Sequence, residues 1–260
     1  MTLPELRLVE HVMGMPVTLV LRGRDASGPA GVAAWSAVVD SLRAADRVFS
    51  TYREDSEISR LRAGTLTHDL ASPEVVEVLA LCEAARVASG GAFDAWRPGP
   101  DGGRALDPSG AVKGWAVERA ARLLDGLDGT DSCLSAGGDM VCRTRAAGSA
   151  GWSIGLEDPR DPARVLARLP ITDGAVATSG TAHRGEHLVD ARTGAVPTGV
   201  ASVTVVTGSL TWADIDATAA YAHGPAAAEW LATRADRTAL VVWADGTTTA
   251  VRTPPAPAAA

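Results

Sequence analysis

Residues Lys113–Arg143, KGWAVERAARLLDGLDGTDSCLSAGGDMVCR, contain the change of pattern that decides the fold. Lys113–Leu127 carries apolar residues at helical spacing, and two short apolar runs follow at Ser132–Leu134 and Met140–Arg143. These patterns predict a helix and then two strands. A doubly wound sheet would instead alternate single strands with helices. The stretch therefore favours an α+β fold.

The rest of the chain continues this irregular mixture of short strands and helices. We expect a single compact domain over residues 1–253, built from a mixed, largely antiparallel sheet with packed helices, and a disordered Pro/Ala-rich tail over 254–260. The other predicted helices are Gly31–Val48, Pro73–Ala88, Trp212–His223 and Ala226–Arg234. The other predicted strands are Leu6–Val12, Val17–Leu21, Trp152–Leu156, Val165–Leu169, Ala175–Thr178, Ser202–Thr207, Thr238–Trp243 and Thr247–Arg252.

Composition limits the function classes. A net charge of -7 argues against a general nucleic-acid binder, because neutralising phosphates requires a basic surface. No apolar run reaches the roughly 20 residues that a membrane span needs, and the first residues do not resemble a secretory signal. We therefore expect a cytoplasmic protein, or an exported one if a leader has been trimmed.

Two residue types are informative through their small number. The cysteines Cys82, Cys133 and Cys142 form no CxxC motif, and one would stay unpaired if two formed a disulfide, so we expect a reducing compartment. Among 24 basic residues only Lys113 is lysine. Arginine replaces lysine freely on a solvated surface but not where a compact ammonium is required, so Lys113 is a candidate functional residue.

Lys113 follows the turn Asp107-Pro108-Ser109-Gly110, and the predicted helix places it in the first turn. The helix dipole opposes a cation there. One interpretation is a solvated surface lysine. The other is that free main-chain N–H groups and the ammonium hold a phosphate together. The sequence alone does not separate them.

A second candidate is the pair Asp214 and Thr218, which share one face of a predicted helix because they are four residues apart. A carboxylate and a hydroxyl, completed by main-chain carbonyls, water and substrate phosphate, can hold Mg²⁺. Thr211 with Asp214 also fits a capping box, and from spacing alone the cap is the better interpretation.

A third candidate is His187, followed by Leu188, Val189 and Asp190. Histidine accepts a proton near neutral pH, and a nearby aspartate can orient it, although a lone histidine at a strand end is more often structural. Three glycine-containing segments allow close approach of the backbone to a ligand, or are simple turns. They are Gly90–Asp94, Ala136–Asp139 and Ala177–Gly180.

Taken in order, these motifs resemble the ApbE family of FAD:protein FMN transferases. The resemblance runs from Met13-Gly14 to about Gly224. Its motifs are Ser50-Thr51-Tyr52, Asp55–Leu61, Gly91-Ala92-Phe93-Asp94, Gly110–Gly114, Gly137-Gly138-Asp139, Ala177–Gly180, His187–Gly194 and Ala213-Asp214 with Thr218.

The resemblance implies roles for individual residues. Asp214, Thr218 and a main-chain carbonyl at Gly110 would bind Mg²⁺, and His187 would be the base that deprotonates the acceptor. The FAD site would be lined by Met13, Tyr52, Ala92, Phe93, Asp94, Lys113, Ala116 and Leu188. The implied reaction transfers FMN from FAD to a serine or threonine hydroxyl of an acceptor protein and releases AMP, with Mg²⁺ and Lys113 relieving the negative charge of the pyrophosphate.

The sequence departs from the family pattern around the expected FAD contacts. Arg62 replaces an asparagine, Ala95-Trp96 replaces Pro-Thr, Ala191 replaces a proline, and the segment after Asp94 is short. Two alternatives therefore stay open. One is an FAD pyrophosphatase that uses water as the acceptor, and the other is an FAD-binding protein without turnover.

Overall fold

The computed structural model describes residues 3–98, 103–180 and 188–255. Its main sheet has eight strands in the order β1-β2-β5-β6-β9-β10-β11-β12, and the neighbouring strands pair antiparallel. These strands are Glu5–Val12, Met15–Gly23, Thr130–Ala136, Asp139–Arg143, Gly174–Gly180, Val200–Thr207, Thr238–Trp243 and Thr248–Arg252. The order follows the chain, so each strand pairs with the next one after the intervening helices or hairpins.

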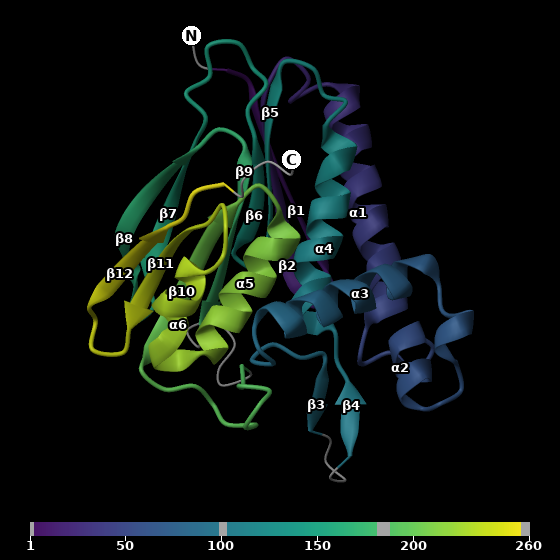
Figure 1. The fold of residues 1–260 in the computed structure, drawn as a ribbon. Helices are drawn as coiled ribbons and strands as arrows, with labels where there is room; N and C mark the ends of the chain where they lie inside the picture. Colours follow the sequence, from purple (N-terminus) through teal and green to yellow (C-terminus); the bar gives the residue numbers. More distant parts are fainter. Residues whose placement is uncertain (1–2, 99–102, 181–187, 256–260) are drawn as a thin grey trace, which may run out of the picture.

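Helices cover one face of this sheet, as Figure 1 shows for α1, α4 and α5. The helices are α1 (Pro29–Phe49), α2 (Glu57–Arg62), α3 (Pro73–Ala88), α4 (Ser109–Ala121), α5 (Leu210–Ala222) and α6 (Ala227–Ala232), with short 3-10 turns η1 (His68–Leu70), η2 (Arg122–Leu124) and η3 (Gly224–Ala226). The main core lies between this helical layer and the sheet. α5 is buried over nearly its whole length, which explains its continuous apolar and alanine-rich sequence.

Two hairpins lie outside the main sheet. β7 (Trp152–Asp158) pairs with β8 (Asp161–Ile171). The apolar side chains of this hairpin form a second, smaller core with residues of β5, β6 and β9. β3 (Trp96–Pro98) pairs with β4 (Arg104–Leu106) just before α4. The two faces of the sheet are therefore covered differently, by helices on one side and by the β7–β8 hairpin on the other.

The α+β expectation is confirmed, and the long predicted elements are present to within a few residues at their ends. The sequence analysis missed α2, η1, β3 and β4, which are too short to show a periodic pattern. The predicted helix over Ala226–Arg234 is shorter than expected, because a 3-10 turn precedes α6.

Two local predictions are wrong. α4 begins at Ser109 rather than at Lys113, so the lysine lies in the second turn, where the dipole argument loses force. The N-cap of α5 is Ser209, whose side chain accepts a hydrogen bond from Trp212 N. Asp214 therefore has no capping role, and its burial requires another explanation.

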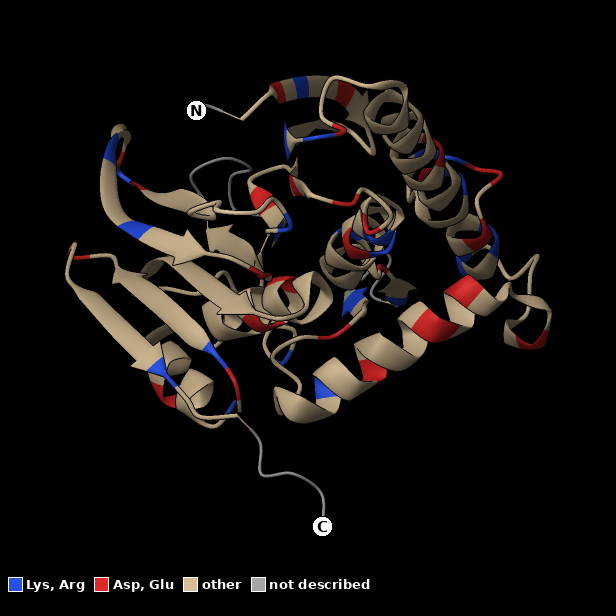
Figure 2. Cartoon of the chain, turned by 90° about the horizontal axis from the view of Figure 1, so that it is seen from above, with Lys and Arg blue, Asp and Glu red and all other residues tan. Residues whose placement is uncertain are grey.

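Both acidic and basic residues occur on most of the helices (Figure 2), and α3 carries three glutamates and one arginine. Among the helices in the described ranges, none combines the length and apolar character needed to cross a bilayer.

Candidate functional site

A buried charged cluster lies where α4, α5 and the β5–β6 turn meet. Lys113 Nζ lies 3.1 Å from Asp214 Oδ1 and also forms an ion pair with Asp139 Oδ2. Asp139 and Asp214 are 1% and 2% exposed, and the lysine side chain is 14% exposed. Two carboxylates and one ammonium leave one negative charge, so the cluster attracts cations.

The second oxygen of each carboxylate is held by the main chain. Gly114 N donates to Asp214 Oδ2 at 2.9 Å, and Thr178 N donates to Asp139 Oδ1 at 3.0 Å. Asp139 Oδ2, which is also buried, has the Lys113 ammonium as its partner. Burial raises the pKa of Asp214 to about 6, and Asp139 adds to this increase, whereas Lys113 opposes it.

Gly114 makes this geometry possible because α4 and α5 approach closely there. A Cβ atom at position 114 would lie 2.8 Å from Leu210 O and 2.9 Å from Asp214 Cβ, both shorter than a normal contact. Only glycine therefore lets the two backbones come near enough for its N–H to reach the Asp214 carboxylate.

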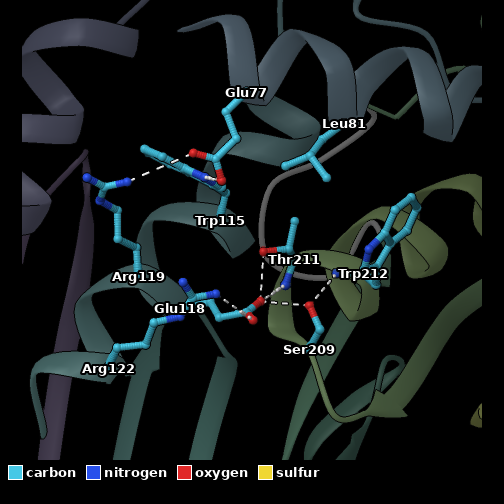
Figure 3. A pocket seen from close by; sticks show the side chains of 9 residues that line it. All are labelled: Glu77, Leu81, Trp115, Glu118, Arg119, Arg122, Ser209, Thr211 and Trp212. Carbon is cyan, nitrogen blue, oxygen red and sulfur yellow. Dashed lines mark hydrogen bonds and ion pairs between the residues drawn. The ribbon is translucent and has the colours of Figure 1, made fainter. Parts of the chain in front are cut away.

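Glu118 secures the same helix pair one turn further along α4. Its Oε2 accepts hydrogen bonds from Ser209 Oγ at 2.7 Å, Thr211 N at 2.8 Å and Thr211 Oγ1 at 2.7 Å (Figure 3). Burial acts to raise the pKa of Glu118, but these hydrogen bonds outweigh it and the pKa is lowered. The carboxylate thus joins the N-terminus of α5 to α4.

The small cavity drawn in Figure 3 lies beside this junction and is lined by none of the predicted site residues. Glu77, Trp115, Arg119 and Arg122 are among the residues around it. Glu118 also lines this cavity, and its carboxylate is already used in holding α5 against α4. The cavity therefore lies beside the residues that join α4 to α5 and is not part of the candidate site.

Hydroxyl groups extend the cluster along β9 and α5. Thr218 Oγ1 lies 3.1 Å from Ser179 Oγ, and Thr178 Oγ1 lies 2.9 Å from Thr204 Oγ1. Thr218 is one helical turn from Asp214 on the same face of α5. Carboxylate and hydroxyl oxygens of this kind are hard donors that suit Mg²⁺, and the excess negative charge suits a cation. No group of three or more His, Cys, Asp or Glu ligands occurs within the described ranges, so a metal here would also need main-chain, water or substrate oxygens.

The segment Gly91–Asp94 packs against the start of α4. A Cβ at Gly110 would lie 2.9 Å from Phe93 Cε2, so the ring rests directly on this glycine. Ala191 N donates to Ala92 O at 3.2 Å, which brings the loop after Leu188 to the same place. The predicted metal residue Gly110 and the predicted FAD residues Ala92, Phe93 and Leu188 thus belong to one neighbourhood, although all but Gly110 are 7% exposed or less.

The family model of ApbE matches residues 13–96 and 98–242, which include every segment of this site. The chain belongs to the ApbE family. Comparison with curated proteins gives no match to this sequence.

Solved ApbE structures share the fold of this family member. A flavinyl transferase ApbE of Pseudomonas stutzeri matches with a TM-score of 0.81 at 22% identity, covering 96% of each chain. The flavin transferase ApbE of Vibrio cholerae matches with a TM-score of 0.79 at 20% identity, covering 96% of this chain and 97% of that one. An ApbE protein of Thermotoga maritima gives 0.79 at 21% identity, with coverage of 96% and 97%.

The remaining predicted residues of this ApbE chain take separate places. Tyr52 is 96% exposed, Met13 occupies the β1–β2 turn with a positive φ of 55°, and Ala116 is buried in the main core at 2% exposure. Asp94 accepts hydrogen bonds from Trp96 N at 2.8 Å and Arg104 Nη2 at 2.5 Å, which fixes it to the β3–β4 hairpin. The contacts described for Asp94 lie outside the Lys113 cluster, whereas Ala116 lies about one turn beyond Lys113 on α4. His187, the predicted base, lies outside the described residues.

Most positions that depart from the family pattern gather around β3 and β4, whereas Ala191 contacts Ala92. Arg62 Nε donates to Leu106 O, which ties α2 to β4, and Ala95 O accepts from Asp107 N at 2.6 Å. The described parts of the shortened segment thus pair with each other as β3 and β4 and make contacts of their own. Trp96 on β3 is 42% exposed.

Sequence reasoning did not single out Asp139 or Ser179 as site residues. Both lie in glycine-containing segments that were interpreted as close-approach or turn segments. The signal for Asp139 was its position directly after Gly137-Gly138, where a two-residue turn starts the next strand. Its partner, Lys113, is more than twenty residues away and becomes a neighbour only through the fold.

Proposed function

We propose that this ApbE-family chain is an FAD:protein FMN transferase that requires Mg²⁺, attaches FMN to a serine or threonine hydroxyl of an acceptor protein and releases AMP. Family membership supports the proposal, as do its structural relatives from Vibrio cholerae and Pseudomonas stutzeri, which are named as flavin transferases. The observation that carries it is the cluster of Lys113, Asp139 and Asp214 beside Thr218, because it supplies cation-binding oxygens and an ammonium in one place.

Asp214, Thr218 and the main-chain carbonyl of Gly110 are the proposed magnesium ligands. Bound Mg²⁺ would reduce the negative charge of the substrate pyrophosphate as a Lewis acid. The excess negative charge of the cluster, two buried carboxylates against one ammonium, fits a cation at this position.

The protein's own residues bind FAD and move the proton. Lys113 presents positive charge to the phosphates, and the proposed lining residues hold the dinucleotide. His187 accepts the proton of the acceptor hydroxyl while the oxygen of that hydroxyl attacks the phosphorus of the FMN half. The bond from that phosphorus to the AMP oxygen breaks, so AMP leaves and a phosphoester joins FMN to the acceptor. The proposed lining residues are Met13, Tyr52, Ala92, Phe93, Asp94, Lys113, Ala116 and Leu188.

The direct test incubates the protein with FAD, Mg²⁺ and a protein bearing a Ser/Thr-Gly-Ala-Ser/Thr acceptor segment. We expect a covalent flavin on the acceptor by mass spectrometry, one AMP released for each flavin attached, and no transfer when Mg²⁺ is chelated. Release of FMN and AMP without an acceptor would identify a pyrophosphatase instead. Binding of intact FAD in Mg²⁺ without any product would identify a non-catalytic binding protein.

Two variants separate the proposed roles. Asp214→Ala is expected to abolish transfer and its metal dependence while the fold stays intact by circular dichroism. His187→Ala is expected to bind FAD with unchanged affinity while the transfer rate falls by a factor of about 100 or more. Wild-type transfer in either variant would remove that residue from the proposed mechanism.

A further inference from the structure

We propose that Cys133 and Cys142 form an oxidisable pair that closes to a reversible disulfide across β5 and β6. The two residues are direct partners in the antiparallel register, and their Sγ atoms lie 3.7 Å apart as free thiols. This proposal is independent of flavin transfer, because the pair lies in the core cluster beneath the β7–β8 hairpin and away from the helical face that carries Lys113.

The register places the pair at the type of position that suits a cross-strand disulfide. The β5–β6 turn consists of Gly137 and Gly138, both with positive φ, and such two-residue turns join their flanking residues by main-chain hydrogen bonds. Hydrogen-bonded and non-hydrogen-bonded pairs alternate along an antiparallel ladder. Counting from the pair Ala136–Asp139, the cysteines fall on a non-hydrogen-bonded pair.

At a non-hydrogen-bonded pair the Cα atoms are about 4.5 Å apart, which lies within the range that a disulfide spans. Closing the bond brings the sulfur atoms from 3.7 Å to about 2.05 Å, a change that side-chain rotation can supply without a shift of register. The backbone is therefore already arranged for the oxidised form.

The surroundings give the two thiols different roles. The hydrogen bond donated by Cys142 Sγ lowers the pKa of the Cys133 thiol, burial opposes this, and the nearby Arg22 guanidinium adds to it. Arg22 is held close by stacking on Trp152, with its Cζ 4.2 Å from the ring centroid. The same hydrogen bond and burial raise the pKa of Cys142. Cys133 is also the more exposed of the two side chains, so it is the attacking thiolate and Cys142 the resolving thiol.

A hydroperoxide is the proposed oxidant, because Cys133 is 7% exposed and Cys142 is fully buried, so only a small reagent has access. The Cys133 thiolate attacks one peroxide oxygen, breaks the O–O bond and becomes a sulfenic acid as hydroxide leaves. The Cys142 sulfur then attacks the Cys133 sulfur, the S–O bond breaks, and the lost oxygen leaves as water with the Cys142 proton. Two thiols and one hydrogen peroxide thus give one disulfide and two waters.

Cys82 provides a matched internal control. It is as buried as the pair, at 3% exposure, but it lies alone on α3, and burial raises its pKa to about 12 with Asp94 and Asp107 adding to the effect. Burial without a partner thiol should leave it unreactive toward the same reagent.

The test exposes the reduced full chain to hydrogen peroxide, quenches with an alkylating reagent in denaturant and maps the peptides without reduction. We expect one linked species joining Cys133 and Cys142 in the wild type and in Cys82→Ser, which dithiothreitol reverses. Cys133→Ser and Cys142→Ser should give no link. The Tm of the oxidised wild type and of oxidised Cys82→Ser should rise by a few degrees, whereas treated Cys142→Ser should show no rise.

A parallel sample treated in urea keeps the proposal falsifiable if a serine variant fails to fold. The fraction of oxidised Cys133 that ends in the link to Cys142, rather than as sulfenic or sulfinic acid, should be larger in the folded protein than in the unfolded one, because the strands hold the sulfurs together. The proposal is overturned if that fraction is no larger in the folded state, if both cysteines remain alkylatable after treatment, or if Cys133 passes to the sulfinic acid without a link.

Discussion

At the scale of single residues, Lys113 is the centre of the site. Its ammonium is shared between two carboxylates that are almost completely buried, so each of the three groups depends on the others. The sequence pointed to Lys113 because it is the only lysine in the chain. The structure explains why this position is lysine and not arginine. The space between Asp139 and Asp214 suits a compact ammonium better than a planar guanidinium.

Replacing Lys113 with methionine should destabilise the metal-free protein by about 3–5 kcal/mol, because it leaves two buried carboxylates without a cation. Urea unfolding followed by circular dichroism measures this change. Arg43→Met is the matched control. Arg43 pairs with Glu10 at 3.2 Å on the surface, where the loss should be at most about 1 kcal/mol. Equal losses in the two variants would contradict the central role of Lys113.

Asp214 could be predicted as a site residue from the sequence, whereas Asp139 could not. Helical spacing placed Asp214 and Thr218 on one face, and the structure agrees. The capping interpretation of Asp214, which spacing alone favoured, is wrong, because Ser209 caps the helix. Asp139 was missed, since its partner belongs to a distant helix and only the tertiary fold brings them together.

At the scale of elements, the contact between α4 and α5 decides the geometry of the site. The sequence predicted both helices but not their contact, because a glycine inside a helix gives no information about which neighbour it approaches. Gly114 and Glu118 together fix that contact along two turns of α4.

Gly114→Ala should therefore push the two helices apart. The added methyl group overlaps Leu210 O and Asp214 Cβ, so we expect a loss of about 1–3 kcal/mol in the free energy of unfolding and weaker Mg²⁺ binding by calorimetry. Gly126→Ala is the matched control, because a Cβ there meets nothing within 4 Å. If both alanine variants unfold at the same urea concentration, close helix packing is not what fixes Asp214.

Glu118→Gln tests the second attachment through pH. Because the pKa of Glu118 is lowered in the folded protein, its carboxylate contributes stability that is present above its unfolded pKa of about 4.3 and is lost as pH falls further. The glutamine variant should be less stable than the wild type near pH 7, and the difference should shrink below about pH 4. A difference that stays constant from pH 7 to pH 3, measured by urea unfolding, would contradict this.

Over the whole molecule, the end of the chain is tied back to the site helix. Asp216 on α5 is 1% exposed and accepts hydrogen bonds from Arg234 Nε at 3.2 Å and Arg237 Nε at 2.6 Å, just before β11. The last two strands of the sheet are thus joined to the helix that carries Asp214. The sequence predicted one domain with a mixed, largely antiparallel sheet, and the eight-stranded antiparallel sheet agrees with this. The order of the strands could not be predicted, since pairing between distant strands leaves no local signal in the sequence.

Asp216→Asn should lower the free energy of unfolding by about 3 kcal/mol, because two arginines lose their buried counter-charge. Unfolding should remain a single transition by both fluorescence and circular dichroism, since the residue joins parts of one core. Asp173→Asn, which removes an exposed pair with Arg145 at 2.7 Å, is the control with little expected change. Separate transitions in Asp216→Asn would show that the C-terminal strands fold apart from α5.

Because Lys113 is the only lysine, cleavage after it can be used to measure local unfolding of α4. A protease specific for lysine has a single peptide bond to hydrolyse in the entire chain, the one between Lys113 and Gly114. That bond lies inside α4, against the backbone of α5, where no protease can bind it in an extended form. The rate at which the chain is cut into two pieces therefore measures how often the helix unravels, and anything that holds the carboxylates around Lys113 in place should slow the cut.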